Sequence, residues 1–395
     1  MKFPKSFFWG AATSSYQVEG GNKHSDWWRW EISASGGKNI EHSGKACDFW
    51  KKYPEYFDFL ERGKMNSFRL SIEWARVQPQ KNKWDAKAFE HYRKIIQDLR
   101  KRKIEPIVTL WHFTLPQWLA KTGGWQDPLA LKCFEKYVKK IQKELGQDVK
   151  YWITLNEPGV YIFKSFLEGD WPPQKRFALF DAIMLRKIFI KAHKIAFSIL
   201  KTRDNFVSCS FNLSSDEIRV KINPINHLVK YFLESFSDWG FLKKLKNELD
   251  FTSVNYYFRN LINFPFQVTG GNKKSKESSD LDWEIYPKGI YLVVKKAFKI
   301  SGKPIFITEN GLADAKDEKR EKFLKDHIYW LHRAFETGTP VIGYLHWSLM
   351  DNFEWSMGKT PRFGLLEMDY KKMAVKPRNS FWFYKKLIET YTERI

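Results

Sequence analysis

Short β-type runs alternate with longer amphipathic stretches along most of the chain, and this alternation limits the fold more than any other feature. The runs recur eight times, and the segments between them place apolar residues at helical spacing. Strands that alternate with helices build a parallel sheet, because each helix returns the chain to the same edge. Eight such units close on themselves, so we expect an α/β fold in which residues 1–395 form a single (β/α)₈ barrel domain. The expected strands are Phe7–Thr13, Ser67–Ser71, Glu105–His112, Tyr151–Asn156, Val207–Asn212, Phe251–Tyr257, Ile305–Glu309 and Val341–Trp347.

The clearest helical stretches lie between these runs and are long enough to cover the outside of a barrel. They are Ala86–Lys103, Leu129–Leu145, Phe180–Lys201 and Lys319–Glu336. After the sixth strand, the segment Thr269–Asp280 is rich in Gly, Lys and Ser, which predicts a mobile loop before the next helix.

Two glutamates stand at the strand ends where such barrels keep their active sites. Glu157 follows the run Tyr151–Asn156 in Thr-Leu-Asn-Glu-Pro, and Glu309 ends the run Ile305–Glu309 in Ile-Thr-Glu-Asn-Gly. Side chains at the carboxyl ends of barrel strands face the active site. Glycosidic bond cleavage needs two carboxyl groups in one cleft, since one protonates the leaving oxygen and the other attacks the anomeric carbon. The pair therefore predicts a glycosidase.

Two further segments make this signal specific. Phe7–Gly20 reads Phe-Phe-Trp-Gly-Ala-Ala-Thr-Ser-Ser-Tyr-Gln-Val-Glu-Gly, and Gly343–Trp355 reads Gly-Tyr-Leu-His-Trp-Ser-Leu-Met-Asp-Asn-Phe-Glu-Trp. With the two glutamate motifs in order between them, the chain resembles glycoside hydrolase family 1, the retaining β-glucosidases and β-galactosidases, from about Phe7 to Phe383. The resemblance implies an exo-acting enzyme that removes one β-linked sugar from the non-reducing end without a metal or an organic cofactor.

The resemblance assigns catalytic roles to four residues. Glu309 resembles the nucleophile, and Arg69 matches the arginine beside it, whose positive charge lowers the pKa of a carboxyl group. Tyr257 resembles the tyrosine that donates a hydrogen bond to the nucleophile. Glu157 resembles the acid/base, and the negative charge of Glu309 about 5 Å away raises its pKa.

The resemblance also implies a set of residues that bind the sugar. Asn156 matches the asparagine that holds the 2-hydroxyl group, and Trp347 offers a flat apolar face to the pyranose ring. Suitable substrates are β-linked disaccharides, short oligosaccharides and aryl or alkyl β-glycosides. The full set of expected binding residues is Gln17, His112, Asn156, Asn255, Trp347, Glu354, Trp355 and Phe363.

Glu354 bears on the class of substrate. Relatives that act on 6-phosphorylated sugars replace this glutamate and add a cationic phosphate site. A carboxylate here repels a phosphate, so we expect an unphosphorylated sugar. Lys359 and Arg362 lie nearby in the sequence, which leaves a 6-phospho-β-glycosidase as an alternative.

The net charge of +22 raises the question of an anionic partner. The lysines are spread over many expected helices rather than gathered in one stripe, and no nucleic-acid recognition motif accompanies them. We therefore expect no specific nucleic-acid partner, and we interpret the charge as solvated outer helix faces.

Cysteine content and hydropathy indicate the compartment. Cys47, Cys133 and Cys209 are odd in number and form no Cys-x-x-Cys motif, which argues against a disulfide framework or a zinc site. The first residues lack the apolar core of a signal peptide. No apolar stretch approaches the roughly 18 residues that span a bilayer. We expect a cytoplasmic enzyme without a membrane partner.

Several properties stay open at this level. The choice among glucose, galactose and fucose depends on the orientation of one hydroxyl group. The aglycone, the balance between hydrolysis and transglycosylation, and the oligomeric state have no sequence signal. A sugar-binding barrel without catalytic activity is the alternative from another class, and the presence of both glutamates argues against it.

Overall fold

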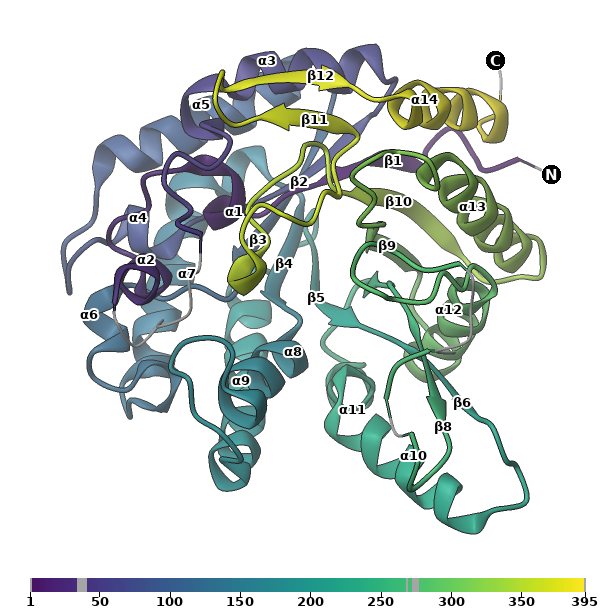
Figure 1. Cartoon of the computed structure of the whole chain (residues 1–395). Helices are drawn as coiled ribbons and strands as arrows, with labels where there is room; N and C mark the ends of the chain where they lie inside the picture. The colour runs from purple at the N-terminus through teal and green to yellow at the C-terminus, as the bar shows by residue number, and fades with distance from the viewer. Residues whose placement is uncertain (1, 34–40, 268, 272–276, 394–395) are drawn as a thin grey trace.

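A closed barrel of parallel strands forms the centre of the molecule (Figure 1). The computed structural model describes residues 2–33, 41–267, 269–271 and 277–393. Neighbouring strands follow chain order around the barrel, and β1 pairs with β10 to close it. The barrel strands are β1 (Phe8–Ala12), β2 (Ser67–Ser71), β3 (Glu105–Trp111), β4 (Tyr151–Asn156), β5 (Phe206–Asn212), β7 (Thr252–Asn255), β9 (Ile305–Asn310) and β10 (Val341–Trp347).

An outer helix follows each barrel strand, as the sequence predicts for a (β/α)₈ barrel. These helices are α3 (Phe49–Arg62), α5 (Ala86–Lys101), α7 (Ala130–Leu145), α9 (Leu179–Leu200), α11 (Asp238–Leu245), α12 (Lys288–Ser301), α13 (Arg320–Glu336) and α14 (Asn379–Tyr391). The predicted barrel strands and the predicted long helices begin and end within two residues of the observed ones. The expected fold is therefore confirmed.

The connections from strand to helix carry additional elements, which the sequence pattern did not predict. They decorate the carboxyl end of the barrel. The helical ones are α1 (Ser15–Glu19), α2 (Asp26–Ile32), α4 (Trp74–Val77), α6 (Gln117–Ala120), η2 (Gly124–Gln126), α8 (Pro158–Ile162), the π-helix η4 (Phe163–Glu168), α10 (Pro224–Phe236) and η5 (Trp355–Met357). The extended ones are β6 (Ser215–Ile218) paired with β8 (Arg259–Ile262), and β11 (Leu366–Asp369) paired with β12 (Ala374–Pro377). A further 3₁₀ turn, η3 (Gly146–Asp148), precedes β4.

The barrel interior is filled by apolar side chains, as is typical of this fold. Ile107, Ile153, Phe306 and Leu345 come from four different strands and belong to one fully buried cluster. The barrel wall is equally tight, because a Cβ at Gly10 would lie 1.9 Å from a backbone oxygen of the neighbouring strand. The polar residues at the carboxyl ends of the strands therefore lie above a packed interior.

Three further sequence predictions concern the rest of the chain. The three cysteines are unpaired, as expected. No described helix combines the length and the apolar character needed to cross a membrane. The expected mobile loop Thr269–Asp280 falls partly outside the described residues, which exclude 272–276.

Candidate active site

Glu157 leaves the end of β4 in an unusual backbone conformation. Its φ of 43° and ψ of 59° lie in the left-handed region, which residues other than glycine seldom adopt. The backbone N–H of Glu157 donates to the carbonyl oxygen of Ser210 at 2.9 Å, and Pro158 begins α8 immediately afterwards. Such strain persists where the surroundings fix it, and it gathers at functional sites. Here it directs the carboxyl group towards β7.

Asn255 of β7 receives that carboxyl group. Its Nδ2 donates to Glu157 Oε1 at 2.6 Å. The hydroxyl groups of Ser210 and Thr308 donate to Asn255 Oδ1 at 2.9 and 2.8 Å. Because these hydroxyl donors occupy the amide oxygen, the amide nitrogen is the group that faces Glu157.

Glu309 lies in β9 with both carboxyl oxygens engaged. Arg69 of β2 forms an ion pair with Oε1, and the hydroxyl group of Tyr257 donates to Oε2 at 2.7 Å. Arg69 is fully buried. A buried guanidinium and a hydroxyl donor both favour the ionised form of a carboxyl group.

The position of Arg69 is itself fixed by polar contacts across the barrel. Its Nε donates to Thr109 Oγ1 at 3.0 Å, and its Nη2 donates to Asn156 Oδ1 at 2.6 Å. The Nδ2 of Asn156 lies 3.1 Å from His112 Nε2. One hydrogen-bonded network therefore joins Glu309 to the expected sugar-binding residues Asn156 and His112.

The two glutamates have unlike electrostatic environments. Burial raises the pKa of Glu157 well above its ordinary value, and the charge of Glu309 raises it further. Burial also raises the pKa of Glu309, but Arg69 and Tyr257 act in the opposite direction. Glu157 is thus the carboxyl group that keeps its proton, and Glu309 is the one that ionises first.

Two residues that the sequence did not single out support Glu157. The buried carboxyl group of Asp238 accepts hydrogen bonds from the backbone N–H of Gly159 at 2.7 Å and of Asn212 at 2.8 Å. Burial raises the pKa of Asp238 to about 7. The side chain of Asn212 hydrogen-bonds Glu157 and lowers its pKa. Asn212 ends an expected strand, so the strand-end rule could have found it, but Asp238 begins a helix and carries no such signal.

Three aromatic side chains of the expected binding set lie together. The ring of His112 is close to parallel with the indoles of Trp347 and Trp355, at centroid distances of 6.1 and 6.2 Å. Burial and then Arg69 hold the pKa of His112 well below its ordinary value, so the imidazole is neutral. Within the described part of the chain, His112 Nδ1 has no hydrogen-bond partner. This atom is therefore available to a hydroxyl group of a ligand.

Gln17 and Glu354 form a second polar pair from distant parts of the chain. Gln17 Nε2 donates to Glu354 Oε2 at 3.3 Å and to the carbonyl oxygen of Phe353 at 2.9 Å. Burial, followed by the charge of Glu309, raises the pKa of Glu354 to about 8, while a hydrogen bond from Trp347 lowers it. Glu354 is therefore largely protonated at neutral pH.

The remaining expected binding residue, Phe363, is buried in the apolar cluster that also holds Trp347. Its ring lies 6.4 Å from that of Tyr257 and 6.3 Å from that of Trp283. The contacts of Phe363 are thus with side chains of the site. Trp283 also lies beside Tyr257, and the sequence did not single it out.

The cations near Glu354 in the sequence are engaged elsewhere. Lys359 forms an ion pair with Glu41 at 3.1 Å, and Arg362 forms one with Asp351 at 3.4 Å. Among the residues that the structure describes, no group of three or more His, Cys, Asp or Glu side chains is placed to hold a metal ion.

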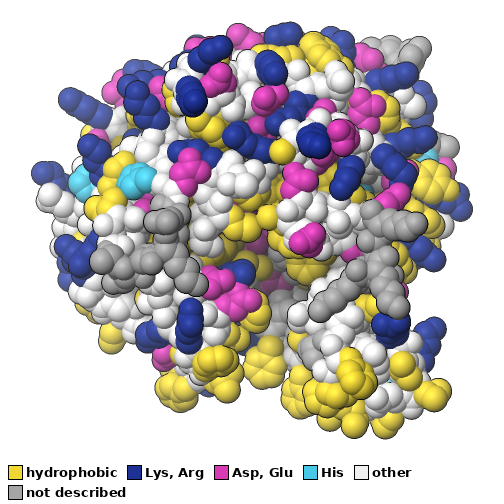
Figure 2. Space-filling view, viewed as in Figure 1, with side chains coloured by type: hydrophobic (Ala, Val, Ile, Leu, Met, Phe, Trp, Pro, Cys, Tyr) yellow, Lys and Arg dark blue, Asp and Glu magenta, His cyan; other side chains and the backbone are white. Residues whose placement is uncertain are grey.

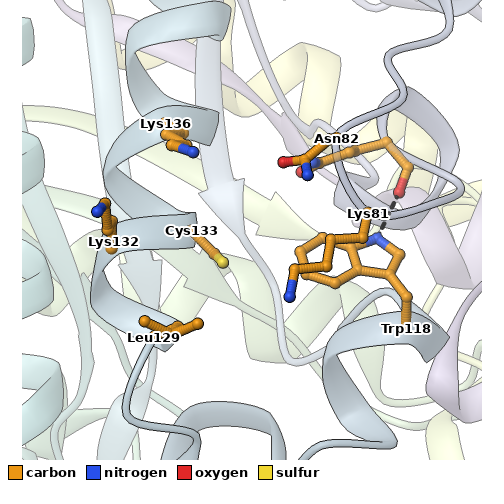
Figure 3. Close-up of a pocket in the computed structure, with 8 residues that line it drawn as sticks. Lys81, Asn82, Trp118, Leu129, Lys132, Cys133 and Lys136 are labelled. Atoms are coloured by element: carbon orange, nitrogen blue, oxygen red, sulfur yellow. Dashed lines mark hydrogen bonds between the residues drawn. The ribbon is translucent and has the colours of Figure 1, made fainter.

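A cavity of about 170 Å³ lies elsewhere, on the outer wall (Figure 3). Trp118 Nε1 donates to the carbonyl oxygen of Gln78 at 2.9 Å on one side of it, and Cys133 of α7 lies on the other. None of the expected active-site residues lines this cavity. Its lining consists of Gln78, Lys81, Asn82, Trp118, Leu129, Lys132, Cys133 and Lys136.

A barrel with two buried carboxyl groups of unlike environment at its carboxyl end has the architecture of a glycosidase. The model of glycosyl hydrolase family 1 matches residues 1–223 and 234–393, and the chain belongs to this family. The unmatched internal residues, 224–233, lie within α10. The protein is accordingly an O-glycosyl hydrolase that acts on β-glycosides, as the sequence predicted.

Individual relatives carry related activities in their names. The chain is 30% identical to "Beta-glucosidase A" of Thermotoga maritima over 440 aligned positions, which cover 98% of each chain. It is 28% identical to a "6-phospho-beta-galactosidase" of Leptotrichia buccalis over 98% of this chain and 99% of the relative. The solved "beta-glycosidase from Pyrococcus horikoshii" superposes with a TM-score of 0.92 at 34% identity, covering 99% of this chain and 98% of that one.

Proposed function

We propose that the protein is an exo-acting, retaining β-glucosidase that also accepts β-galactosides and β-fucosides. The observation that carries this proposal is the difference between the two glutamates. Arg69 and Tyr257 stabilise the anion of Glu309, whereas burial and the neighbouring negative charge keep Glu157 protonated. A retaining glycosidase needs this combination of one nucleophile and one acid.

In the first step, Glu309 attacks the anomeric carbon of the sugar. The bond from that carbon to the aglycone oxygen breaks, and Glu157 gives its proton to this oxygen as it leaves. The products are a sugar ester of Glu309, the free aglycone alcohol and an ionised Glu157. Asn255, which donates to Glu157, then stabilises the new negative charge.

In the second step, the ester has removed the charge of Glu309, which is one of the two main causes of the raised pKa of Glu157. The ionised Glu157 takes a proton from water as the water oxygen attacks the anomeric carbon. The ester bond breaks, and Glu309 leaves as a carboxylate. Two displacements at one carbon restore its original configuration.

The sugar-binding residues supply orientation. Asn156 receives the 2-hydroxyl group, where a hydrogen bond gains strength in the transition state. The unpartnered His112 Nδ1 takes a neighbouring hydroxyl group. Gln17 and Glu354 bridge two others, and Trp347 supports the apolar face of the ring.

An unphosphorylated substrate is indicated by the ion pairs that engage the nearby cations, and not by the charge of Glu354. Because the pKa of Glu354 is about 8, its charge repels a phosphate only weakly at neutral pH. Lys359 and Arg362 are held in ion pairs with other residues, so neither is poised to bind a phosphate. The three unpaired cysteines support a reducing compartment, and we propose a cytoplasmic location.

A panel of 4-nitrophenyl glycosides tests this function. The β-glucoside should give the highest kcat/KM, the β-galactoside and β-fucoside should follow, and the β-glucoside 6-phosphate should be roughly 10²-fold poorer, since a buried polar site built for a hydroxyl group must accept a dianion. A preference for the 6-phosphate would establish the alternative activity. A folded protein that cleaves none of them would contradict the proposed substrates.

A further inference from the structure

Helix α10 buries two polar side chains and exposes most of its apolar ones. In a surface helix the apolar face normally packs on the core and the polar face meets water. In α10 the polar residues Asn226 and Glu234 are buried, whereas Tyr231 is 63% exposed. The exposed apolar residues of the helix are Ile225, Leu228, Tyr231, Phe232 and Phe236.

Specific contacts hold α10 in this orientation. Asn226 Oδ1 accepts from the backbone N–H of Phe264 at 2.8 Å, and Asn226 Nδ2 donates to the carbonyl oxygen of Val220 at 3.1 Å. Glu234 forms an ion pair with Lys296 of α12 at 2.6 Å. Rotating the helix to bury its apolar face would break all three contacts. These contacts therefore fix the apolar face of α10 on the outside of the molecule.

Neighbouring residues extend this surface into what we call the α10 tip. Ile222, in the turn before the helix, is 92% exposed, and Phe264 and Phe266 are exposed as well. The α10 tip consists of Ile222, Ile225, Leu228, Tyr231, Phe232, Phe236, Phe264 and Phe266. A second apolar surface, the α9 tip, lies at the start of α9, where Phe177 is 86% exposed. The α9 tip consists of Phe177, Leu179, Phe180, Ile183 and Met184. Figure 2 shows hydrophobic side chains along the lower edge of the molecule, where Figure 1 places α9 and α10.

Both tips belong to the rim around the candidate active site. The chain passes from Glu157 through α8 and the π-helix η4 to the α9 tip. It passes from the end of β5 through β6 to the α10 tip. Both segments therefore follow the carboxyl ends of barrel strands, the end that carries Glu157 and Glu309.

The α10 tip lies where the chain departs from the sequence pattern of the family. The family model matches residues 1–223 and 234–393 and leaves residues 224–233, most of α10, unmatched. Contiguous exposed apolar surface that is rimmed by polar residues marks an interaction site.

We propose that the α9 and α10 tips dock on an anionic lipid surface. Interfacial helices insert aromatic and aliphatic side chains between headgroups while basic residues contact anionic lipids. Arg176 and Lys187 are exposed near the α9 tip in sequence, and Lys221 adjoins Ile222 at the α10 tip. Because α9 and α10 lie along the same edge of the molecule, one lipid surface is the proposed partner of both tips.

The net charge favours an anionic lipid surface over a second copy of the chain as the partner. The protein carries a net charge of +22, so two copies repel one another while an anionic surface attracts each of them. The expectation of no membrane partner rests on the lack of a signal-peptide core and of an apolar stretch long enough to span a bilayer. A docked interfacial helix needs no spanning segment.

Vesicle co-sedimentation tests the proposal. The wild-type protein should sediment with vesicles of phosphatidylcholine that contain about one third phosphatidylglycerol at near-physiological salt, and should stay in solution with pure phosphatidylcholine. The variants Phe232→Asp and Phe180→Asp should each reduce the bound fraction at least about tenfold, because a charge enters the inserted face. Tyr329→Asp is the matched control, since Tyr329 is 47% exposed on α13, away from both tips, and the substitution changes the net charge equally.

Hydrolysis of a soluble nitrophenyl glycoside verifies that each variant is folded, and it reads the proposed function independently of lipid binding. Failure of the wild-type protein to bind the anionic vesicles would overturn the proposal. Equal binding of the tip variants and the control would also overturn it, since charge alone would then account for binding. A dimer in light scattering that Phe232→Asp dissociates, without vesicle binding, would assign the α10 tip to a second copy.

Discussion

At the carboxyl end of the barrel, the centre buries charged side chains, whereas the rim exposes apolar ones. At the centre, Arg69, Glu157 and Glu309 are buried, and each has hydrogen-bond partners. At the rim, Phe177 and Tyr231 are apolar and exposed. Burying a charge is unfavourable unless it is paired, and exposing an aromatic ring forgoes its burial. Both arrangements are unfavourable for folding by themselves, which is why we propose a function for each of the two regions.

The largest expected effect comes from the centre. Replacing Glu309 with alanine removes the nucleophile, and kcat for 4-nitrophenyl β-glucoside should fall by roughly 10⁴-fold or more. Added formate or azide should restore some product, now of inverted configuration, because a small anion fits where the carboxylate was. In contrast, Phe180→Ser at the rim should leave kcat for this soluble substrate within about twofold. A Glu309→Ala enzyme with near wild-type kcat would show that Glu309 is not the nucleophile.

The second effect depends on the leaving group. Glu157→Ala should slow the first step by about 10²–10⁴-fold for alkyl glycosides, whose aglycone needs a proton, and much less for dinitrophenyl glycosides, whose aglycone leaves as an anion. Pre-steady-state measurement of aglycone release separates this step from hydrolysis of the ester. Equal slowing of both substrate types would show that Glu157 is not the acid.

The third prediction compares the two regions by stability. Phe306 fills the barrel interior and is fully buried, with ring centroids 5.5 Å from Phe8 and 5.9 Å from Phe251. Phe306→Ala should lower the free energy of unfolding by about 3–5 kcal/mol through lost burial and a cavity. The same change at exposed Phe232 should stay within about 0.5 kcal/mol. Urea unfolding measures both, and similar losses at the two sites would mean that Phe232 is packed in solution.

The smallest effect concerns pH and Glu354. Its folded-state pKa of about 8 lies above its ordinary value of 4.5, so the folded state binds more protons than the unfolded chain between these pH values. The free energy of unfolding therefore falls as pH rises through this window. Glutamine does not titrate, so Glu354→Gln should reduce this fall. Because Glu354 keeps some exposure, the expected reduction is on the order of 1 kcal/mol. Exposed Glu389→Gln on α14 is the control, and an unchanged pH slope in Glu354→Gln would refute the prediction.

Much of the fold was predictable because its signals are local and repeated. The period of the apolar residues and the breakers at strand ends define β4, β10 and α13 within two residues, and barrel closure then brings β4 and β9 to one mouth. The strand-end rule and the resemblance together predicted Glu157 and Glu309 as site residues, since both depend on residues adjacent in sequence.

The remaining features depend on contacts between distant residues. Asp238 supports the Glu157 turn from the start of α11, and nothing in its own neighbourhood indicates that role. The orientation of α10 was equally hidden, because an amphipathic pattern does not show which face meets the core. Only the contacts of Asn226 and Glu234 decide it.

The configuration of the first product tests the central claim most directly. When 4-nitrophenyl β-glucoside is hydrolysed in deuterated buffer, proton NMR can follow the anomeric signals before mutarotation mixes them. Nucleophilic attack by Glu309 followed by water assisted by Glu157 predicts β-glucose as the first product, with α-glucose appearing only later. α-Glucose as the first product would mean a single displacement by water, and would contradict the assignment of Glu309 as the nucleophile.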